Sequence, residues 1–183
     1  MSLPNPGMDA VPFTPLTAEF LDDMIENIEA LSNGTGLATN AVTADKIATN
    51  ANVLGYVQIT SNAVVASSAT PTQVPSLTLT VTVPSGGRRV RITAFAPGIT
   101  TSSANQYAQL QLWSGTVNSG TLLSQGYFVP TTAGYLNAMT VTSVLTPSTG
   151  SKTYNVGVVT GAAASVSVAA GATYPSYLLV EVL

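Results

Sequence analysis

The acidic side chains that could serve as catalytic carboxylates lie almost entirely in the first fifty residues of this 183-residue chain. Glycoside hydrolysis normally needs two carboxyl groups facing one bond, yet residues 55–183 contain one acid, Glu181. The sequence has no histidine to activate a serine or threonine, and a lysine-assisted reaction would depend on Lys46 or Lys152 without a supporting motif. Without cysteine or histidine, thiol chemistry and the usual zinc ligands are also missing. The sequence therefore predicts no enzyme, no catalytic residue, no metal site and no cofactor.

The basic side chains Arg88, Arg89 and Arg91 form the first candidate binding group. Arg88 and Arg91 could contact an anionic glycan or a teichoic polymer on a host surface. The alternative is that charged side chains protect a sheet edge from pairing with another chain, with one arginine paired to Glu181. The sequence leaves both interpretations open.

Aromatic side chains form the second candidate group, because exposed rings can stack on sugars. Trp113, which directly precedes the loop sequence SGTVNSG, and Tyr107 are the candidates for ligand contact. The same choice applies to Tyr127, Phe128 and Tyr135. The alternative for each is a place in the core, where aromatic residues of β-sandwiches are common.

The scaffold for these side chains is expected to be all β over residues 55–183. The segment LTLTVTV at 77–83 alternates apolar and polar residues without error, which is the period of a half-buried strand. Further strands are predicted at 56–60, 89–95, 107–113, 122–129, 138–145, 153–159, 164–169 and 176–182. Connections rich in Pro, Gly, Ser and Asn separate them. About nine short strands of this kind predict a β-sandwich with a jelly-roll arrangement.

The N-terminal residues 1–15 are expected to form an extended arm. They contain four of the eleven prolines, and proline fixes φ and removes a backbone donor. Val11 and Phe13, which lie beside prolines, could fill shallow pockets of a partner. A floppy terminus is the alternative.

The pattern of residues 16–35 predicts one amphipathic helix and its C-terminal cap. The helix spans 16–31, with Thr17 as the N-cap and Gly34 after its end. Its apolar side chains follow helical spacing; they are Phe20, Leu21, Met24, Ile25, Ile28 and Leu31. Because the residues that follow offer no obvious sheet to cover, this face is expected to dock on a partner chain or socket.

Residues 36–54 match neither helix nor strand. Their large apolar residues, Leu37, Val42, Ile47 and Val53, recur at intervals of five, five and six. Burying four such side chains would contribute about 2 kcal/mol each, less than the roughly 1–2 kcal/mol per residue that ordering the backbone costs. We therefore expect a thread in which three identical chains wind round one axis, a short trimeric shaft.

The distribution of charge divides the chain in two. Seven acids against Lys46 give residues 1–50 a net charge of −6, and four basic residues against Glu181 give residues 51–183 a net charge of +3. Four basic residues make no phosphate-binding stripe, so nucleic-acid binding is not expected. No positively charged leader or long apolar run is found, so neither ordinary secretion nor membrane insertion is expected.

Several phrases of the sequence resemble virion proteins of tailed bacteriophages. LPNPG, LTAEFLDDMIENIEAL and NGTGLATNAVTADKI are similar to N-terminal attachment and shaft segments of phage fibres. The part from VPSLTLTVTVPSGGRRVRITAF to YPSYLLVEVL resembles the tumour-necrosis-factor-like jelly-roll heads of such fibres. The shaft holds barely two repeats, which implies a short fibre or capsid decoration.

The resemblance implies a homotrimeric, non-enzymatic structural protein of a virion, assembled in the host cytoplasm. Residues 1–35 would attach to a capsid or tail protein, and the head at 55–183 would serve host recognition or adhesion to a host-surface glycan. The alternative is a non-viral, cell-surface carbohydrate-binding module of similar fold.

Overall fold

The computed structural model describes residues 21–22, 24–26, 28, 52–65, 69–161 and 164–183. The chain divides into two compact units, Met1–Thr49 and Asn50–Leu183. In the first unit the described residues, all between 21 and 28, are helical, as the sequence predicts for 16–31. The predicted arm at 1–15, most of the predicted thread and the remaining helix residues lie outside the described residues.

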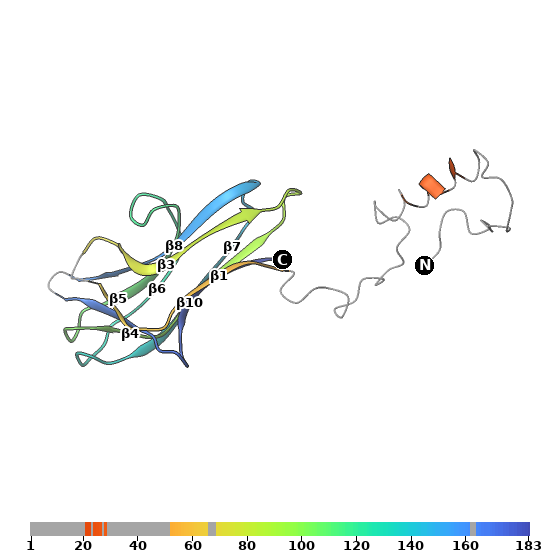
Figure 1. Ribbon diagram of the computed structural model, residues 1–183. Coiled ribbons are helices and arrows are strands. Elements are labelled where there is room, and N and C mark those ends of the chain that lie inside the picture. The colour runs from red at the N-terminus through yellow and green to blue at the C-terminus, as the bar shows by residue number, and fades with distance from the viewer. Residues whose placement is uncertain (1–20, 23, 27, 29–51, 66–68, 162–163) are drawn as a thin grey trace. The chain divides into compact units, whose positions relative to one another are not determined.

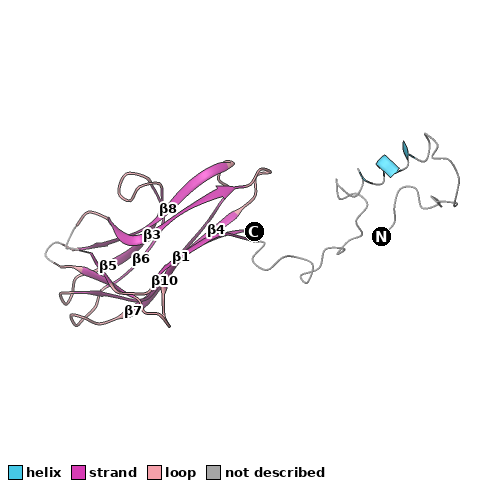
Figure 2. Ribbon diagram, viewed as in Figure 1, coloured by secondary structure: helices cyan, strands magenta, loops and turns pink. Residues whose placement is uncertain are grey.

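The second unit is built from strands joined by short loops (Figure 2). Within the described residues they are β1 (Val53–Ile59), β2 (Ala63–Val65), β3 (Thr72–Val83), β4 (Val90–Thr101), β5 (Ala108–Ser114), β6 (Thr121–Phe128), β7 (Asn137–Leu145), β8 (Gly150–Thr160), β9 (Val166–Ala169) and β10 (Ser176–Val182). The predicted mainly β fold is therefore confirmed.

The strands form two antiparallel sheets that pack face to face (Figure 1). The four-stranded sheet has the order β3-β8-β5-β6. The six-stranded sheet has the order β1-β10-β4-β9-β2, and β7 also pairs with β4. Residues 90–95 of β4 pair with both β10 and β7, so these two strands lie on opposite edges of β4. The resulting orders β1-β10-β4-β7 and β3-β8-β5-β6 are those of a jelly roll.

The registers also define the two ends of the sandwich. Val90 of β4 lies opposite Val182 and Leu145, so the β3–β4 turn, the β7–β8 loop and the C-terminal residue gather at one end, which we call the base. The chain enters β1 at this end, because Asn52 accepts a hydrogen bond from the backbone of Val182 at 2.7 Å. Thr101 lies at the opposite end, the tip, together with the β4–β5, β6–β7 and β8–β9 loops.

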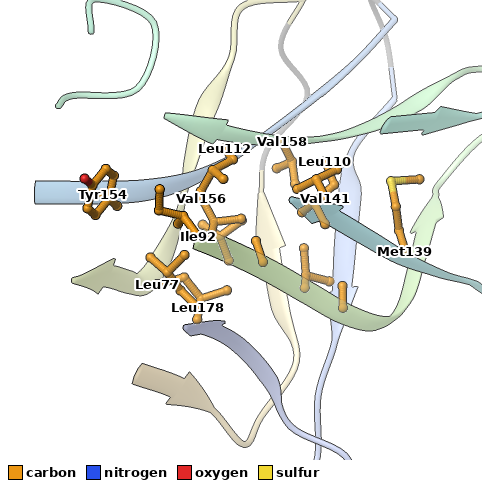
Figure 3. Close-up of a cluster of buried hydrophobic side chains, with 14 of the residues drawn as sticks. Leu77, Ile92, Leu110, Leu112, Met139, Val141, Tyr154, Val156, Val158 and Leu178 are labelled. Atoms are coloured by element: carbon orange, nitrogen blue, oxygen red, sulfur yellow. The ribbon is translucent and has the colours of Figure 1, made fainter. Parts of the chain in front are cut away.

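The core lies between the sheets and follows the alternation of the strands. Leu110, Leu112, Val156 and Val158 from the four-stranded sheet meet apolar side chains of the six-stranded sheet, including Ile92, Val141 and Leu178 (Figure 3). Tyr154 is fully buried at one side of this cluster. Its hydroxyl has no hydrogen-bond partner among the described residues, and burial raises the pKa of Tyr154 above the ordinary value for tyrosine.

The strand predictions differ from the structure mainly in length: β3 begins at Thr72 and not at 77, β4 continues to Thr101 and not to 95, and β1 begins three residues early. β1 begins at Val53, so Val53 and Leu54, assigned from the sequence to the thread, are part of the sandwich, and Val53 lies opposite Glu181. The register shifts between Val53 and Gly55, which interrupts the alternation that the sequence pattern needs. β2 was not predicted because three residues are too short to show a period.

Candidate functional site

The outer face of the four-stranded sheet carries uncharged polar side chains and two aromatic rings. β5 and β6 supply Gln109, Gln111, Trp113, Gln125 and Tyr127, and we call this set the polar face. The sequence AQLQLW positions the first three, because alternate residues of a strand point to the same side. Gln109 lies opposite Tyr127 and Gln111 lies opposite Gln125 in the β5–β6 pairing.

A row of hydrogen bonds connects these side chains. The indole Nε1 of Trp113 donates to Oε1 of Gln111 at 3.1 Å. Nε2 of Gln111 then donates to Oε1 of Gln109 at 3.0 Å and to Oε1 of Gln125 at 3.4 Å. Gln111 is buried, with 4% of its surface exposed, whereas Gln125 is exposed. The row therefore runs from a buried indole to amides at the surface.

Trp113 lies beneath the β5–β6 loop rather than at its surface. Its side chain is buried, with 8% exposed. A Cβ placed on Gly157 would lie 2.9 Å from Val117 and 3.1 Å from the indole nitrogen, so the glycine leaves room for the ring and for Val117 above it. The interpretation of Trp113 as a ligand contact does not fit this position, because a covered ring offers no face for stacking.

Asn155 holds the covering loop on the sheet. Its Nδ2 donates to the backbone oxygen of Gly115 at 2.8 Å, and its Oδ1 accepts from the hydroxyl of Thr78. The backbone N–H of Gly115 donates to the oxygen of Thr153 at 2.8 Å. Gly115 itself has φ 79°, a left-handed conformation that glycine adopts at little cost. The loop is thus fixed at its start, where it covers Trp113.

The outer face of the six-stranded sheet is different in character. Tyr56, Tyr177 and Phe95 form a row across β1, β10 and β4, and with Leu179 we call them the aromatic face. Ring centroids of Tyr56 and Tyr177 are 5.6 Å apart and those of Tyr177 and Phe95 are 5.3 Å apart, each pair tilted by 35°. Partial burial, and then the neighbouring Tyr177, raises the pKa of Tyr56. Tyr56 is 48% exposed, and its hydroxyl donates to Oε1 of Gln58 on the same strand at 2.7 Å.

The arginines lie near the base, away from the polar face. Arg91 donates to Oε2 of Glu181 through Nε at 3.0 Å and through an Nη at 2.8 Å, which is the pairing that the sequence left as an alternative. The guanidinium side chain is 45% exposed and the carboxylate 20%. Arg88 contributes to a shallow open pocket of about 390 Å³ beside Leu54 and Val182.

Charge is confined to the base of the sandwich. Residues 52–183 contain five charged side chains, and each is in or next to a strand end at the base; they are Arg88, Arg89, Arg91, Lys152 and Glu181. Nζ of Lys152 donates to the hydroxyl of Ser148 in the β7–β8 loop at 2.7 Å. The middle of both outer faces and the tip are therefore uncharged.

The remaining residues that the sequence analysis named as site candidates lie neither on the polar face nor among the charged residues of the base. Tyr107 precedes β5 at the tip, is half-buried, and its backbone oxygen accepts from the hydroxyl of Thr160 at 2.6 Å. In the helix, four apolar side chains are exposed by 37–60%; they are Leu21, Met24, Ile25 and Ile28. The predicted contact residues Phe20, Leu31, Leu37, Val42 and Ile47 lie outside the described residues.

The sequence analysis did not predict the row of hydrogen-bonded amides, which we call the amide row (Gln109, Gln111 and Gln125). It named Tyr127 but did not place it beside this row. The signal was present, because QLQ followed by W places two amides and an indole on one face. The described residues contain no cluster of three or more metal-ligating side chains. No helix among them is long and apolar enough to span a membrane.

Comparison with known proteins adds only distant likenesses. No protein-family model matches the sequence, and no curated protein matches it. Among solved structures, Eiger TNF from S. frugiperda is 12% identical with a TM-score of 0.41, over 72% of this chain and 93% of that one. The VP2 subviral particle protein of infectious bursal disease virus is 10% identical with a TM-score of 0.38, over 69% of this chain and 36% of that one.

An aminopeptidase from a marine sediment Thaumarchaeota archaeon is similarly distant, at 10% identity and a TM-score of 0.37, over 59% of this chain. This chain spans 26% of the length of the aminopeptidase. Likenesses at this level do not distinguish between functions.

Proposed function

We propose that this chain is a non-enzymatic, homotrimeric structural protein of a bacteriophage virion. Residues 1–35 attach it to a capsid or tail protein, residues 36–52 form a short thread, and the sandwich is exposed for adhesion to a host or to a glycan. The sequence phrases that resemble phage fibre proteins are the basis for naming a phage virion. The structure supports the division of labour on which this proposal depends.

One observation carries the attachment role: the contrast between the helix and the sandwich. The sandwich buries its own core, with Ile92, Leu112 and Leu178 at 0% exposure, and does not need the first unit to complete it. The helix leaves the side chain of Ile28 60% exposed and that of Ile25 52% exposed. An isolated helix of this length is marginal in water, so such a face gains stability only from a partner. A capsid or tail protein is the partner that we propose.

Truncation tests the attachment role directly. A variant that lacks residues 1–35 should express as a folded β unit, with the thermal transition of the full chain, and should be missing from purified particles. Ile28→Asp should have the same effect on incorporation without changing the β unit, because an unpaired charge in a buried seam is strongly unfavourable. Normal incorporation of either variant would contradict attachment through this segment.

The aromatic face supports the proposed trimer. β1, which continues from the end of the predicted thread, carries Tyr56 on this face, next to Tyr177 and Leu179. In the proposed trimer this face is the contact between copies, where burial of aromatic rings and leucine would stabilise association. Light scattering of the full chain should give three times 18.6 kDa. A monomer at micromolar concentration would contradict the trimer.

The second candidate is a cell-surface carbohydrate-binding module outside any virus. The uncharged polar face is the observation that favours it, since a glycan-binding surface needs no virion. The two candidates differ in location: antibodies to the chain should label purified phage particles in the first case and cell walls in the second.

A further inference from the structure

We propose that the polar face binds an uncharged glycan through Tyr127 and the side-chain amides of Gln109 and Gln125. This proposal rests on the adhesive role proposed above and assigns it a place and a ligand class. The sequence interpretation named Trp113, Tyr107 and the arginines as the candidate ligand contacts and weighed Tyr127 only as one of several further aromatic residues. The structure instead points to three residues on neighbouring strands that no interpretation of the sequence had joined.

The first step of the argument is the polarity of the amide row. An indole N–H can only donate, so Gln111 must present its oxygen to Trp113. The Nε2 group of Gln111 is then turned toward Gln109 and Gln125, and it donates to the oxygen of each. Each outer amide must therefore point its own NH₂ group away from the row. No described residue accepts from Nε2 of Gln109 or Gln125, so both remain available as donors.

Rigidity is the second step. Gln111 is held by three hydrogen bonds and is 96% buried, since 4% of its surface is exposed. The half-buried Gln109 accepts from it at 3.0 Å and is thereby oriented, whereas the exposed Gln125 is oriented more weakly by its 3.4 Å contact. A surface that is arranged before its ligand arrives loses less conformational freedom when it binds.

Tyr127 supplies the third element, an accessible ring. It is 70% exposed, the largest exposure among the large hydrophobic residues of the described chain. It lies directly opposite Gln109, and Gln125 is two residues away on the same side of β6. Directly opposed residues are about 5 Å apart and diagonal neighbours about 7 Å apart. The C–H face of one sugar ring can rest on Tyr127 while its hydroxyl oxygens accept from the two amides.

Charge decides the class of glycan. Lys152 is the charged residue within the strands of the four-stranded sheet, and it lies at the base, bonded to Ser148. Arg91 is paired with Glu181 on the other sheet. An anionic polymer would find no cation on the polar face, whereas a neutral sugar needs none. The aromatic face offers less accessible rings, because Tyr177 and Phe95 are half-buried and Tyr56 is 48% exposed, against 70% for Tyr127.

The experiment measures binding of the full chain to immobilised neutral polysaccharides, namely mannan, galactan, dextran and chitin oligosaccharides, with dextran sulfate as the anionic comparison. We expect binding to at least one neutral polysaccharide with the same affinity at low and high salt, because no ion pair is involved. Tyr127→Ala should weaken it about tenfold or more. Tyr174→Ala, which removes another exposed tyrosine in the β9–β10 loop, should leave it unchanged.

Gln125→Glu tests whether the N–H donor of Gln125 contributes to binding, because glutamate has nearly the same shape but lacks that donor. The new carboxylate still accepts from Gln111, so the row stays intact, but the outward donor is lost. Binding should fall at least about threefold while thermal stability is retained. Gln125→Glu with full affinity would overturn the role of the donor, and binding to dextran sulfate alone would overturn the ligand class.

Three further outcomes separate this inference from the proposed function. If particles contain the protein but it binds none of the neutral polysaccharides, the glycan site is wrong and the structural role stands. If the protein binds as expected but is missing from particles, the virion role is wrong. If Tyr127→Ala alters the mass of the assembly instead of glycan binding, the polar face is a contact between copies and the proposal is overturned.

Discussion

The two outer faces of the sandwich arise from the same alternation of residues but carry different side chains, neighbouring aromatic rings on one sheet and uncharged amides on the other. Tyr177 on the six-stranded sheet is half-buried and has two ring neighbours, Tyr56 at 5.6 Å and Phe95 at 5.3 Å between centroids. Tyr127 on the four-stranded sheet has an amide as its cross-strand neighbour, Gln109, and stays 70% exposed. Alternation determines which side chains leave the core. Each tyrosine has a glutamine across the strand, Gln58 for Tyr177 and Gln109 for Tyr127, but β10 lies between two strands that supply further rings, whereas β6 is an edge strand.

Of the substitutions that test this comparison, replacing Trp113 with alanine should change the free energy of unfolding most. Although Trp113 points outward, it is 8% exposed and lies with the buried Val117 next to Gly157, so its removal leaves a cavity as in a core substitution. We expect a loss of about 3–5 kcal/mol in the free energy of unfolding, measured by urea titration. Tyr127→Ala, the exposed aromatic of the same face, should change it by less than about 0.5 kcal/mol. Equal losses would mean that the two outward rings are equally covered.

Replacing Tyr177 with serine tests the aromatic face. Each chain of the proposed trimer would lose the central ring of the row. The free energy of association should weaken by about 1 kcal/mol per chain, in addition to the loss from the smaller buried apolar area. Sedimentation at falling concentration should show dissociation at higher concentrations than for the unmodified chain. Gln125→Ala on the opposite face is the matched control and should leave the assembly constant unchanged. An unaltered constant for Tyr177→Ser would place the trimer contact elsewhere.

The next prediction concerns Tyr154, which is buried in the core between the two sheets. Its buried hydroxyl has no partner in the described part of the chain, so Tyr154→Phe should stabilise the fold by about 1 kcal/mol. Because burial raises the pKa of Tyr154 in the folded state, the unfolded chain ionises first as pH rises, and stability falls above about pH 10. Below that pH this tyrosine contributes no pH dependence.

The measurement for this prediction is the unfolding midpoint of both proteins between neutral and strongly alkaline pH. The advantage of Tyr154→Phe should be constant at lower pH and should grow in the alkaline range. A phenylalanine variant that is less stable at neutral pH would indicate that the hydroxyl has a partner after all.

The ion pair of Arg91 and Glu181 should give the smallest effect. The pair is partly exposed, and surface pairs contribute about 0.2–1 kcal/mol. Glu181→Gln should therefore lower the midpoint slightly at low salt and not at high salt, since salt screens the attraction. Binding of neutral polysaccharide should not change in this variant, which separates the charged part of the six-stranded sheet from the polar face.

Much of the sandwich could be predicted from the sequence because the strands alternate. LTLTVTV falls within β3, and SYLLVEV at 176–182 coincides with β10. β1 was predicted too short because the register shift at Gly55 breaks the period. β2, at three residues, has too few positions for any pattern. Local pattern thus predicts long regular strands and fails where regularity is interrupted.

The candidate site was harder to predict because it depends on pairing across strands. The sequence places Gln109 and Gln111 on one side of β5, but only the β5–β6 register brings Gln125 to them, and that register shifts between Leu112 and Trp113. The burial of Trp113 depends on a loop that folds back through Asn155, forty residues away in sequence. Arg91 and Glu181 were weighed as a pair because the chain offers so few charges.

The position of β1 has a mechanical consequence. β1 enters at the base and is paired along its length with β10, from Val53 opposite Glu181 to Ile59 opposite Ser176. A pull on the incoming chain runs along the strand, and antiparallel hydrogen bonds stand perpendicular to it. The ladder is then loaded in shear, so its bonds resist together instead of opening one after another. If the sandwich binds a glycan as proposed, β1 and β10 would carry a pulling force together instead of separating one hydrogen bond at a time.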